Sequence, residues 1–599
     1  MTKFLCTTAL RDFWGHNDHL RIFLGPWCFF PNIIGDAPRE QARILPYPWD
    51  NREKMHHAAI YQESVYESML ESLVPLLNQV HATNHTQRFW RIILGTWLLH
   101  YVQIMHERFI SVEAALAVDP LLTTTILAPG SFQTPRYFVD LYRGIEDDIY
   151  NLQLYSIILK ALGVECDEKE WTWSFLQSRK EFFWRSWQRQ SEKIIYYASE
   201  RLAAKSEVIF SAPYINRNSM LRLLLSGRGM LGWWEPCKTV SLDFLDTIDD
   251  HPHRPILSCI SYVPKNNFEV ILRDNLPIFF PKLYLEGFAR VSREMQNSVR
   301  KSKSKVLVSS IGFHENELFK FGAAYWAEEG RHIVLAQHGG SYGVARYNPT
   351  ERLERSVADV FLTWGWDDDD QKTVVLPSAK LSRLKILKQK NQAKSKSVLF
   401  IDNAVMRYHY RTWSGPLGGQ FLRCLAWRDI FFGSLSQDVF SSMQVRMYST
   451  DYGWHVRQHL ASRFLSMHFS NFSESYERQM LEASLVICDA NQTTLLESLA
   501  ADIPTLAFWD PDLWELRPQA KPFFDQLQEV GILFFDPQQA AFAANHYAAN
   551  PSWWHQKKVR EARRIFVHQF ARSDDNWFTT WRGYFALNCG LSVENIEMR

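Results

Sequence analysis

The sequence lacks several features that would assign it to a simple class of protein. Its 8 cysteines are scattered through 599 residues, and no Cys-x-x-Cys pair occurs. A zinc site or a disulfide scaffold is therefore not expected, and a reducing compartment fits this pattern. The formal net charge is +1, so the chain has no excess of positive charge of the kind that binds nucleic acid.

Long apolar segments are also missing. The apolar window Ile92–Met105 is interrupted by His100 and Gln103, and Met1–Leu10 has no apolar core of the kind found in signal peptides. The window predicts a buried helix rather than a membrane span, and the N-terminus does not predict secretion. We therefore expect a cytoplasmic protein, with peripheral contact at the inner membrane left open.

What is present is typical of a packed globular protein. Hydrophobic residues make up 46% of the chain and charged residues 22%, which is an ordinary balance. The length predicts two or three domains. The 23 tryptophans are far more than one sugar-binding site needs, so we expect most of them in the core or between domains.

The segment 306–366 predicts a parallel α/β layer. Apolar runs at 306–310, 332–336 and 359–363 have strand character, and residues 318–329 between the first two have helical spacing. Strands that alternate with helices over short connections are typical of parallel βαβ units. Ligands of such sheets collect outside the carboxyl ends of the strands.

The second half repeats this pattern after a basic segment. Strands are expected at 398–401, 444–448, 485–488 and 504–508, and Lys380–Lys396 is interpreted as a solvated linker. The expected fold class is α/β, with two Rossmann-like domains facing a cleft and a helix-rich N-terminal elaboration. We predict an acceptor-side domain over residues 1–385 and a nucleotide-sugar-binding domain over residues 395–599.

The first candidate site follows the strand at 485–488. A polar turn leads into a helix, whose free N–H groups and dipole favour a phosphate group. The candidate donor-binding residues of this turn and helix are Asn491, Gln492, Thr493, Thr494 and Glu497. Glu497 is placed to bind a ribose hydroxyl. The alternative is that Thr493 only caps the helix and Glu497 faces solvent.

The second candidate site follows the strand at 332–336. Gln337, His338, Gly339, Gly340 and Tyr342 lie in its loop. Glycines allow close approach of a ligand, and His338 is the nearby side chain whose ordinary pKa is closest to neutrality. We predict that His338 acts on an acceptor hydroxyl or a phosphate. The alternative is a structural histidine in a tight turn.

Three further charged residues complete the predicted site. Glu315 is a candidate base, nucleophile or hydroxyl ligand, unless it only eases the dipole of the helix that Asn316 or His314 would cap. Arg446 and Asp451 flank the end of the strand at 444–448, where Arg446 offsets leaving-group charge or forms an ion pair with Asp451.

No metal and no cofactor are predicted. The acidic run Asp367–Asp370 is interpreted as a solvated surface loop. No Asp-x-Asp pair lies at a convincing strand end, and a helix N-terminus can stabilise a departing phosphate without a metal ion.

The chain resembles transferases encoded in gene clusters for O-antigen and other surface polysaccharides. The resemblance covers nearly the whole length. It rests on seven stretches: Leu24–Cys28, Pro48–Arg52, Arg88–Ile92 with Gly95, Gln337–Gly343, Trp364–Gly365, Asp451–Trp454 and Asn491–Glu497. The Gln-His-Gly element is also similar to that of capsule Kdo transferases and teichoic-acid polymerases.

This resemblance implies a B-type glycosyltransferase fold and a nucleotide-activated donor, with CMP linked to Kdo or a nonulosonate favoured. The acceptor is then a glycan or a lipid-linked glycan. A keto-sugar acid carries a carboxylate, for which Arg407, Arg411 or the backbone at Gly418–Gly419 are the candidate partners. Two alternatives stay open: transfer of glycerol or ribitol phosphate, and a non-catalytic binding subunit of a polysaccharide assembly complex.

Overall fold

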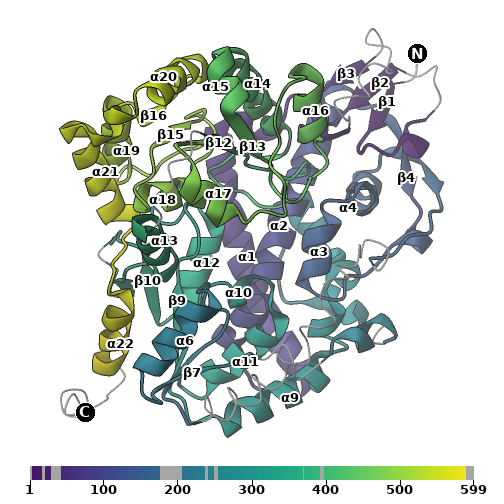
Figure 1. The fold of residues 1–599 in the computed structure, drawn as a ribbon. Helices are drawn as coiled ribbons and strands as arrows, with labels where there is room; N and C mark the ends of the chain where they lie inside the picture. Colours follow the sequence, from purple (N-terminus) through teal and green to yellow (C-terminus); the bar gives the residue numbers. More distant parts are fainter. Residues whose placement is uncertain are drawn as a thin grey trace.

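The computed structural model describes residues 3–15, 20–28, 42–175, 205–235, 241–248, 254–368, 370–390 and 397–588. Within them the chain forms three parallel β-sheets, each built from its own stretch of sequence. Helices cover the sheets (Figure 1). The predicted α/β class is therefore confirmed. The N-terminal elaboration, which was expected to be rich in helices, also contains a sheet.

The first sheet has the order β3-β2-β1-β4-β5, so the chain reverses its direction of growth between β1 and β4. Every pairing in it is parallel. Its strands are β1 (Lys3–Cys6), β2 (Leu20–Phe23), β3 (Ala42–Ile44), β4 (Thr123–Leu127) and β5 (Glu165–Lys169).

The second sheet has the order β11-β10-β9-β8-β6-β7 and contains the segment predicted as the first α/β layer. The chain reverses between β6 and β8. The strand β8 is buried along its whole length, as expected for an interior strand covered on both faces. Its strands are β6 (Val208–Phe210), β7 (Leu231–Trp233), β8 (Val306–Ser309), β9 (His332–Ala336), β10 (Val360–Thr363) and β11 (Thr373–Val375).

The third sheet has the order β13-β12-β14-β15-β16, with its reversal between β12 and β14. All four strands that the sequence predicts in this half are present. The members of the sheet are β12 (Val398–Ile401), β13 (Met443–Arg446), β14 (Leu485–Cys488), β15 (Thr505–Phe508) and β16 (Leu533–Phe534). Such reversals are the switch points at which open α/β sheets bind their ligands.

Two long helices join the first two layers. The side chain of Asn51 caps α1 (Arg52–His81), and that of Thr86 caps α2 (Gln87–Val118). The helix α2 is buried over most of its length, between α4 (Asp148–Ala161) of the first layer and α11 (Glu317–Glu328) of the second. No helix among the described residues combines the length and the apolarity needed to cross a bilayer.

Shorter helices connect the strands of each layer. Around the first and second sheets they are α3 (Phe138–Gly144), α6 (Arg217–Ser226), α7 (Asn267–Asp274), α8 (Leu276–Phe279), α9 (Phe288–Lys301), α10 (Gly312–Glu315) and α12 (Pro349–Val357). Around the third sheet they are α14 (Phe421–Gly433), α15 (Gln437–Ser442), α16 (Val456–Arg463), α17 (Tyr476–Glu482), α18 (Thr493–Ala500), α19 (Lys521–Glu529), α20 (Pro537–Ala549) and α21 (Lys557–Phe570).

The predicted linker at Lys380–Lys396 is wrong for most of its length. Residues Ala379–Lys390 form the helix α13, in which Leu381 and Leu384 are buried. The basic residues misled the interpretation because they alternate with the apolar ones that pack inward. The predicted domain boundary at residues 385–395 lies between the second and third sheets and stays a prediction, since residues 391–396 lie outside the described part.

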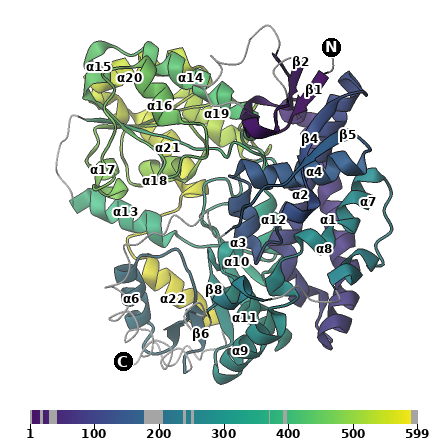
Figure 2. The ribbon, with the colours of Figure 1, turned by 90° about the vertical axis from the view of Figure 1, so that its right-hand side faces the viewer.

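The last described helix crosses from the third sheet back to the second. In Figures 1 and 2 the helix α22 (Trp577–Asn588) lies apart from the other yellow helices and beside α6. Trp577, Trp581 and Phe585 are buried in one apolar cluster with β6 and β8. The two layers are thus tied together by the chain in both directions.

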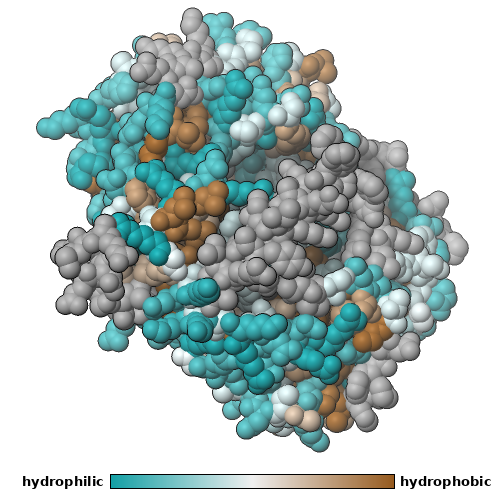
Figure 3. Space-filling model, turned by 60° about the horizontal axis from the view of Figure 1, so that its bottom comes forward, coloured by the Kyte–Doolittle hydropathy of each residue, from teal (hydrophilic) through white to brown (hydrophobic). Residues whose placement is uncertain are grey.

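The surface in Figure 3 is mainly hydrophilic where it is described, with small separate hydrophobic groups. Scattered apolar groups of this kind are normal on a protein surface. This face therefore gives no support to the peripheral membrane contact that the sequence left open, which stays a prediction.

Candidate active site

The two predicted sites meet at one point. The backbone N–H of Gly340, in the loop after β9, donates to the hydroxyl of Thr493 at the start of α18, at 3.1 Å. A Cβ on Gly340 would lie 2.5 Å from the carbonyl carbon of Gln492, so only glycine permits this approach. The carboxyl ends of the second and third sheets therefore face each other, as the sequence predicted.

A second contact extends this junction. Ala345 and Leu516 form an antiparallel bridge between the loops that follow β9 and β15. Next to it, Arg517 donates two hydrogen bonds to the carboxylate of Glu351, at 2.9 and 3.0 Å. The contact between the two layers is thus built from backbone, hydroxyl and charged groups together.

A large cavity lies at the switch point of the second sheet. Its volume is about 950 Å³, within the range of substrate pockets. Tyr214, from the loop after β6, lines it with His314 and Glu315, from the short helix α10 that follows β8. His338 and Tyr448 complete this group. The two predicted catalytic residues, His338 and Glu315, therefore share one cavity.

The side chain of His338 is partly exposed to this cavity, and its ring contacts Tyr342 and the backbone of Ser310. The hydroxyl of Tyr342 lies 3.3 Å from both ring nitrogens of His338 and donates to Glu354 at 2.9 Å. Burial, followed by the charge of Arg411, lowers the pKa of His338 to about 4, against a hydrogen bond to the Ser310 backbone that raises it. His338 is consequently neutral at pH 7, with one ring nitrogen unprotonated.

Glu354 is the carboxylate nearest to this histidine. Its Oε1 lies 3.8 Å from Nδ1 of His338, and its side chain is 1% exposed. Burial raises the pKa of Glu354 well above its usual range. Tyr342 and Glu354 together therefore orient the imidazole of His338. Tyr342, which was predicted to bind substrate, is itself buried and serves this orientation.

A smaller cavity of about 180 Å³ lies at the switch point of the third sheet. Its wall comes from residues that follow β12, β13 and β14. They are Asn403, Ala404, Val405, Met406, Tyr410, Arg411, Trp413, Pro416, Tyr448, Tyr452 and Gln492, together with Tyr142. Because Tyr448 lines both cavities, they are neighbours.

Arg411 is the charged residue of the smaller cavity. It donates one hydrogen bond, from Nη1 to the hydroxyl of Thr350 at 3.0 Å, and its buried Nε has no partner. Its guanidinium lies 5.1 Å from the ring centre of Tyr410 and 4.8 Å from that of Trp413. Among the described residues it has no carboxylate partner, so its charge is available to an anion.

The other candidates for a carboxylate partner have structural roles. Arg407 is buried, and its Nη2 lies 2.5 Å from the carboxylate of Asp148. A Cβ on Gly419 would lie 2.5 Å from the ring of Pro26, so that glycine packs closely against the first layer. Of the two arginines named from the sequence, Arg411 is therefore the one without a carboxylate partner among the described residues, and the backbone at Gly418–Gly419 stays a prediction.

Four predicted binding residues are engaged in hydrogen bonds or a turn, and none of them lines either of the two cavities described above. Gln337 accepts hydrogen bonds from the backbone of Trp364 and the indole of Trp366. Asp451 accepts three backbone N–H groups of its own turn. Arg446 donates to the carbonyls of residues 471 and 474 and to Gln479, so neither interpretation made for it, a charge on the leaving group or an ion pair with Asp451, is observed. Gly339 forms the turn beside Gly340.

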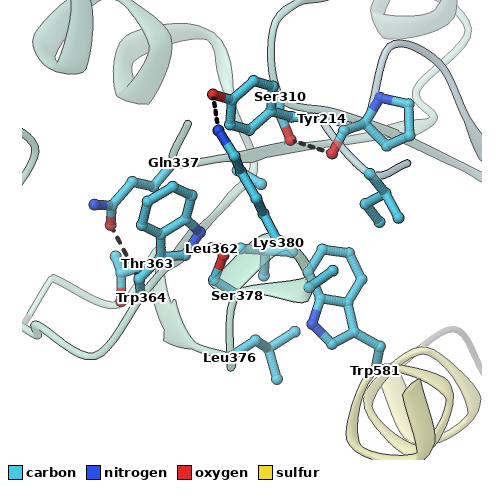
Figure 4. A pocket seen from close by; sticks show the side chains of 14 residues that line it. Tyr214, Ser310, Gln337, Leu362, Thr363, Trp364, Leu376, Ser378, Lys380 and Trp581 are labelled. Carbon is cyan, nitrogen blue, oxygen red and sulfur yellow. Dashed lines mark hydrogen bonds between the residues drawn. The ribbon is translucent and has the colours of Figure 1, made fainter. Parts of the chain in front are cut away.

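Glu497 is buried and paired, which contradicts the solvent-facing interpretation, while ribose binding stays a prediction. Its Oε1 lies 2.5 Å from the amine of Lys380, and its Oε2 accepts from the hydroxyl of Tyr476 at 2.7 Å. Figure 4 shows the same amine directed at the hydroxyl of Tyr214, at 2.7 Å. The free space beside these groups is about 10 Å³, room for one water, so this is a structural contact between the layers.

The strand ends under the turn 489–494 are joined by a buried charge cluster. Arg428 on α14 forms ion pairs with Asp402, which follows β12, and Asp489, which follows β14. Burial raises the pKa of Asp489 to about 6, although Arg428 opposes the shift. The cluster fixes the turn that carries Asn491, whose amide oxygen is buried without a hydrogen-bond partner among the described residues.

The remaining predictions have simple structural outcomes. Asn316 caps α11 by accepting from the N–H of Phe319 at 3.0 Å, as one alternative stated. In the acidic run, Asp368 and Asp370 both pair with Arg355, at 2.6 and 2.7 Å. No group of three or more potential metal ligands occurs in the part of the chain that the structure describes.

Comparisons with known proteins agree with the sequence on family. Residues 3–585 match the model of a family described as LIC12162 family transferase. A search of curated proteins finds no match. Among solved structures, one titled "Trehalose-6-phosphate from E. coli bound with UDP-2-fluoro glucose" is 10% identical, with a TM-score of 0.34, and covers 63% of this chain and 98% of its own. MurG of Acinetobacter baumannii is 11% identical, with a TM-score of 0.32 and the same coverages.

Proposed function

The chain belongs to the LIC12162 family of transferases, and on that premise we propose that it is a glycosyltransferase. It moves a sugar from a nucleotide donor to a glycan or lipid-linked acceptor during synthesis of a bacterial surface polysaccharide. The observation that carries the proposal is the pair of neighbouring cavities at the facing switch points of two parallel sheets, one with a neutral histidine and the other with an unpaired arginine.

The donor occupies the smaller cavity. Gln492 lines this cavity and is also the N-cap residue of α18, so the free N–H groups of that helix lie beside it. Thr493 accepts from Gly340 and keeps its own hydroxyl hydrogen to donate. A phosphate at this end gains the helix dipole, backbone N–H groups and a hydroxyl. The favoured donor is a CMP-linked nonulosonate or Kdo, which presents one phosphate.

The acceptor occupies the larger cavity, where His338 acts as the general base. The acceptor oxygen attacks the anomeric carbon of the donor, its proton passes to the unprotonated ring nitrogen of His338, and the bond from the anomeric carbon to the phosphate oxygen breaks. The electrons of that bond leave with the nucleotide, whose charge the N-terminus of α18 stabilises. Glu315 faces the same cavity and orients an acceptor hydroxyl.

The test is release of nucleotide from defined donors. The protein is incubated with CMP-activated acids, UDP-sugars or GDP-sugars and with an oligosaccharide or lipid-linked acceptor, and the products are followed by mass spectrometry. We expect CMP release together with a product heavier by one sugar. Turnover with UDP- or GDP-sugars alone would overturn the cytidine donor but keep glycosyl transfer. A product heavier by glycerol or ribitol phosphate would replace glycosyl transfer itself.

A further inference from the structure

We propose that Arg411 binds a carboxylate on the donor sugar and so selects acidic sugars. This inference rests on the proposed function and deepens it, because it assigns the part of the donor that α18 does not hold.

The first observation is the missing counter-charge. Most buried or half-buried arginines of the described chain have a carboxylate partner. Examples are Arg52 with Glu515, Arg254 with Glu286, Arg428 with Asp489 and Arg517 with Glu351. Arg411 has none and is only partly exposed. A cation kept out of solvent without a partner is costly, so an anionic ligand that completes the pair gains affinity.

The second observation is that the guanidinium is already held in position. Thr350 accepts from one side, and the rings of Tyr410 and Trp413 flank it. A planar guanidinium with free N–H groups matches a planar carboxylate through two parallel hydrogen bonds. Little side-chain freedom is lost when such a ligand binds, which favours affinity.

The third observation is the charge of the neighbouring groups. Arg411 is one of the causes that lower the pKa values of His338, His314 and His100, after burial. These three imidazoles are therefore neutral at pH 7, and among these four side chains Arg411 alone offers a positive charge to an anion. The charge of Arg411 also acts on the pKa of Glu354. The side chain of Glu354 is bonded to Tyr342, however, and no ion pair joins it to Arg411 among the described residues.

The remaining question is whether Arg411 binds a carboxylate or a phosphate. Both anions suit an arginine, but the phosphate already has a place at the N-terminus of α18, next to Gln492. Gln492 and Arg411 line one cavity, so a ligand that fills it can present one anionic group to each. A CMP-linked keto-sugar acid carries these two groups, whereas an uncharged sugar on the same nucleotide would leave Arg411 unpaired.

The experiment compares three ligands on four proteins by calorimetry. The ligands are CMP, CMP-N-acetylneuraminate as the acidic-sugar probe, and UDP-glucose. The proteins are the wild type, Arg411→Gln, Arg411→Lys and the control Arg352→Gln, which removes an exposed arginine paired with Glu63. In the wild type we expect the acidic sugar to add roughly 10- to 100-fold to the affinity for CMP. Arg411→Gln should lose that gain and keep CMP affinity within about twofold. Arg411→Lys, which cannot form the planar pair, should recover only part of it.

Each other outcome has a definite meaning. Equal weakening of CMP and CMP-N-acetylneuraminate in Arg411→Gln would place Arg411 on the phosphate and overturn the proposal. So would weakening of UDP-glucose, or a wild type in which the acidic sugar adds nothing. If the wild type binds none of the three ligands and releases no nucleotide, the proposed function fails as well. If nucleotide is released but the role of Arg411 is overturned, glycosyl transfer remains the proposed function.

Discussion

Arg407 and Arg411 lie four residues apart in one loop, yet they belong to two different kinds of crevice. Arg407 closes the switch point of the first sheet, where Trp14 and Trp27 donate to the carbonyls of Thr8 and Thr7. Its own charge is paired with Asp148. Arg411 faces the open switch point of the third sheet without a carboxylate partner. The switch point of a parallel sheet is therefore closed by packed side chains in the first layer, whereas in the third layer it is an open candidate site.

The first test of this contrast removes the base from the open side. His338→Ala should lower turnover by about two to four orders of magnitude, the usual contribution of a general base, while the folded structure persists. The matched control is His332→Ala, an exposed histidine at the start of β9, the strand that leads into the loop of His338. Nucleotide release under saturating donor gives the rate. Near-normal turnover in a folded His338→Ala protein would make His338 a structural residue.

The second test removes each arginine in turn. Arg407→Ala leaves Asp148, which is 14% exposed and also accepts from Tyr408 and the N–H of Ala9, without its ion pair, so the free energy of unfolding should fall by about 3 kcal/mol. Arg411→Ala removes one hydrogen bond, to Thr350, and no ion pair with a described carboxylate, so we expect a loss of about 1 kcal/mol or less. Urea titrations measure both values. Equal losses in the two variants would end the distinction between a filled and an open crevice.

Much of the fold was predictable, because apolar runs that alternate with helices describe a parallel sheet whatever their order in space. The meeting of the loops after β9 and β14 also followed from the rule that ligands gather at strand ends. The roles of Gln337, Arg446, Asp451 and Glu497 did not follow. Each has the right residue type at the right strand end, and only long-range partners such as Lys380 for Glu497 show that it is already engaged.

The stretches that carry the family resemblance explain part of this difficulty. Several of them lie where layers touch instead of lining a cavity. Arg52 reaches Glu515 on the third layer, and a Cβ on Gly453 would lie 2.8 Å from Nε of Arg407. A motif therefore marked a residue as important without saying whether it binds a ligand or another layer. Arg411 lies outside these stretches, and its absent partner could not be read from the sequence.

A third test uses pH, because the closed interior also holds neutral histidines. Burial lowers the pKa of His100 to about 3, against 6.5 for an ordinary histidine. The unfolded chain then binds one more proton than the folded one between these values, so stability is complete above pH 6.5 and falls as the pH is lowered. At pH 5 the loss is about 2 kcal/mol for this histidine.

The variant His100→Gln should remove that part of the pH dependence. The control His57→Gln changes an exposed histidine on α1 and should leave the dependence unchanged. Free energies of unfolding between pH 5 and pH 7 give the comparison. If His100→Gln and the wild type lose stability in parallel, His100 is protonated in the folded protein and the interior there is open to water.

The smallest expected effect lies where the open crevices meet. Thr493→Val keeps the branched shape and deletes the hydroxyl that accepts from the N–H of Gly340. A buried N–H without a partner should cost about 1 kcal/mol of stability, and a phosphate at α18 loses one donor, so CMP affinity should fall severalfold. Thr493→Ser keeps the hydroxyl and should restore both quantities. Urea titration and calorimetry on the two variants separate these contributions. Thr493→Val could instead have the same free energy of unfolding and the same CMP affinity as the wild type. In that case the hydroxyl neither holds the two layers together nor contacts the nucleotide, and the donor site must be sought away from α18.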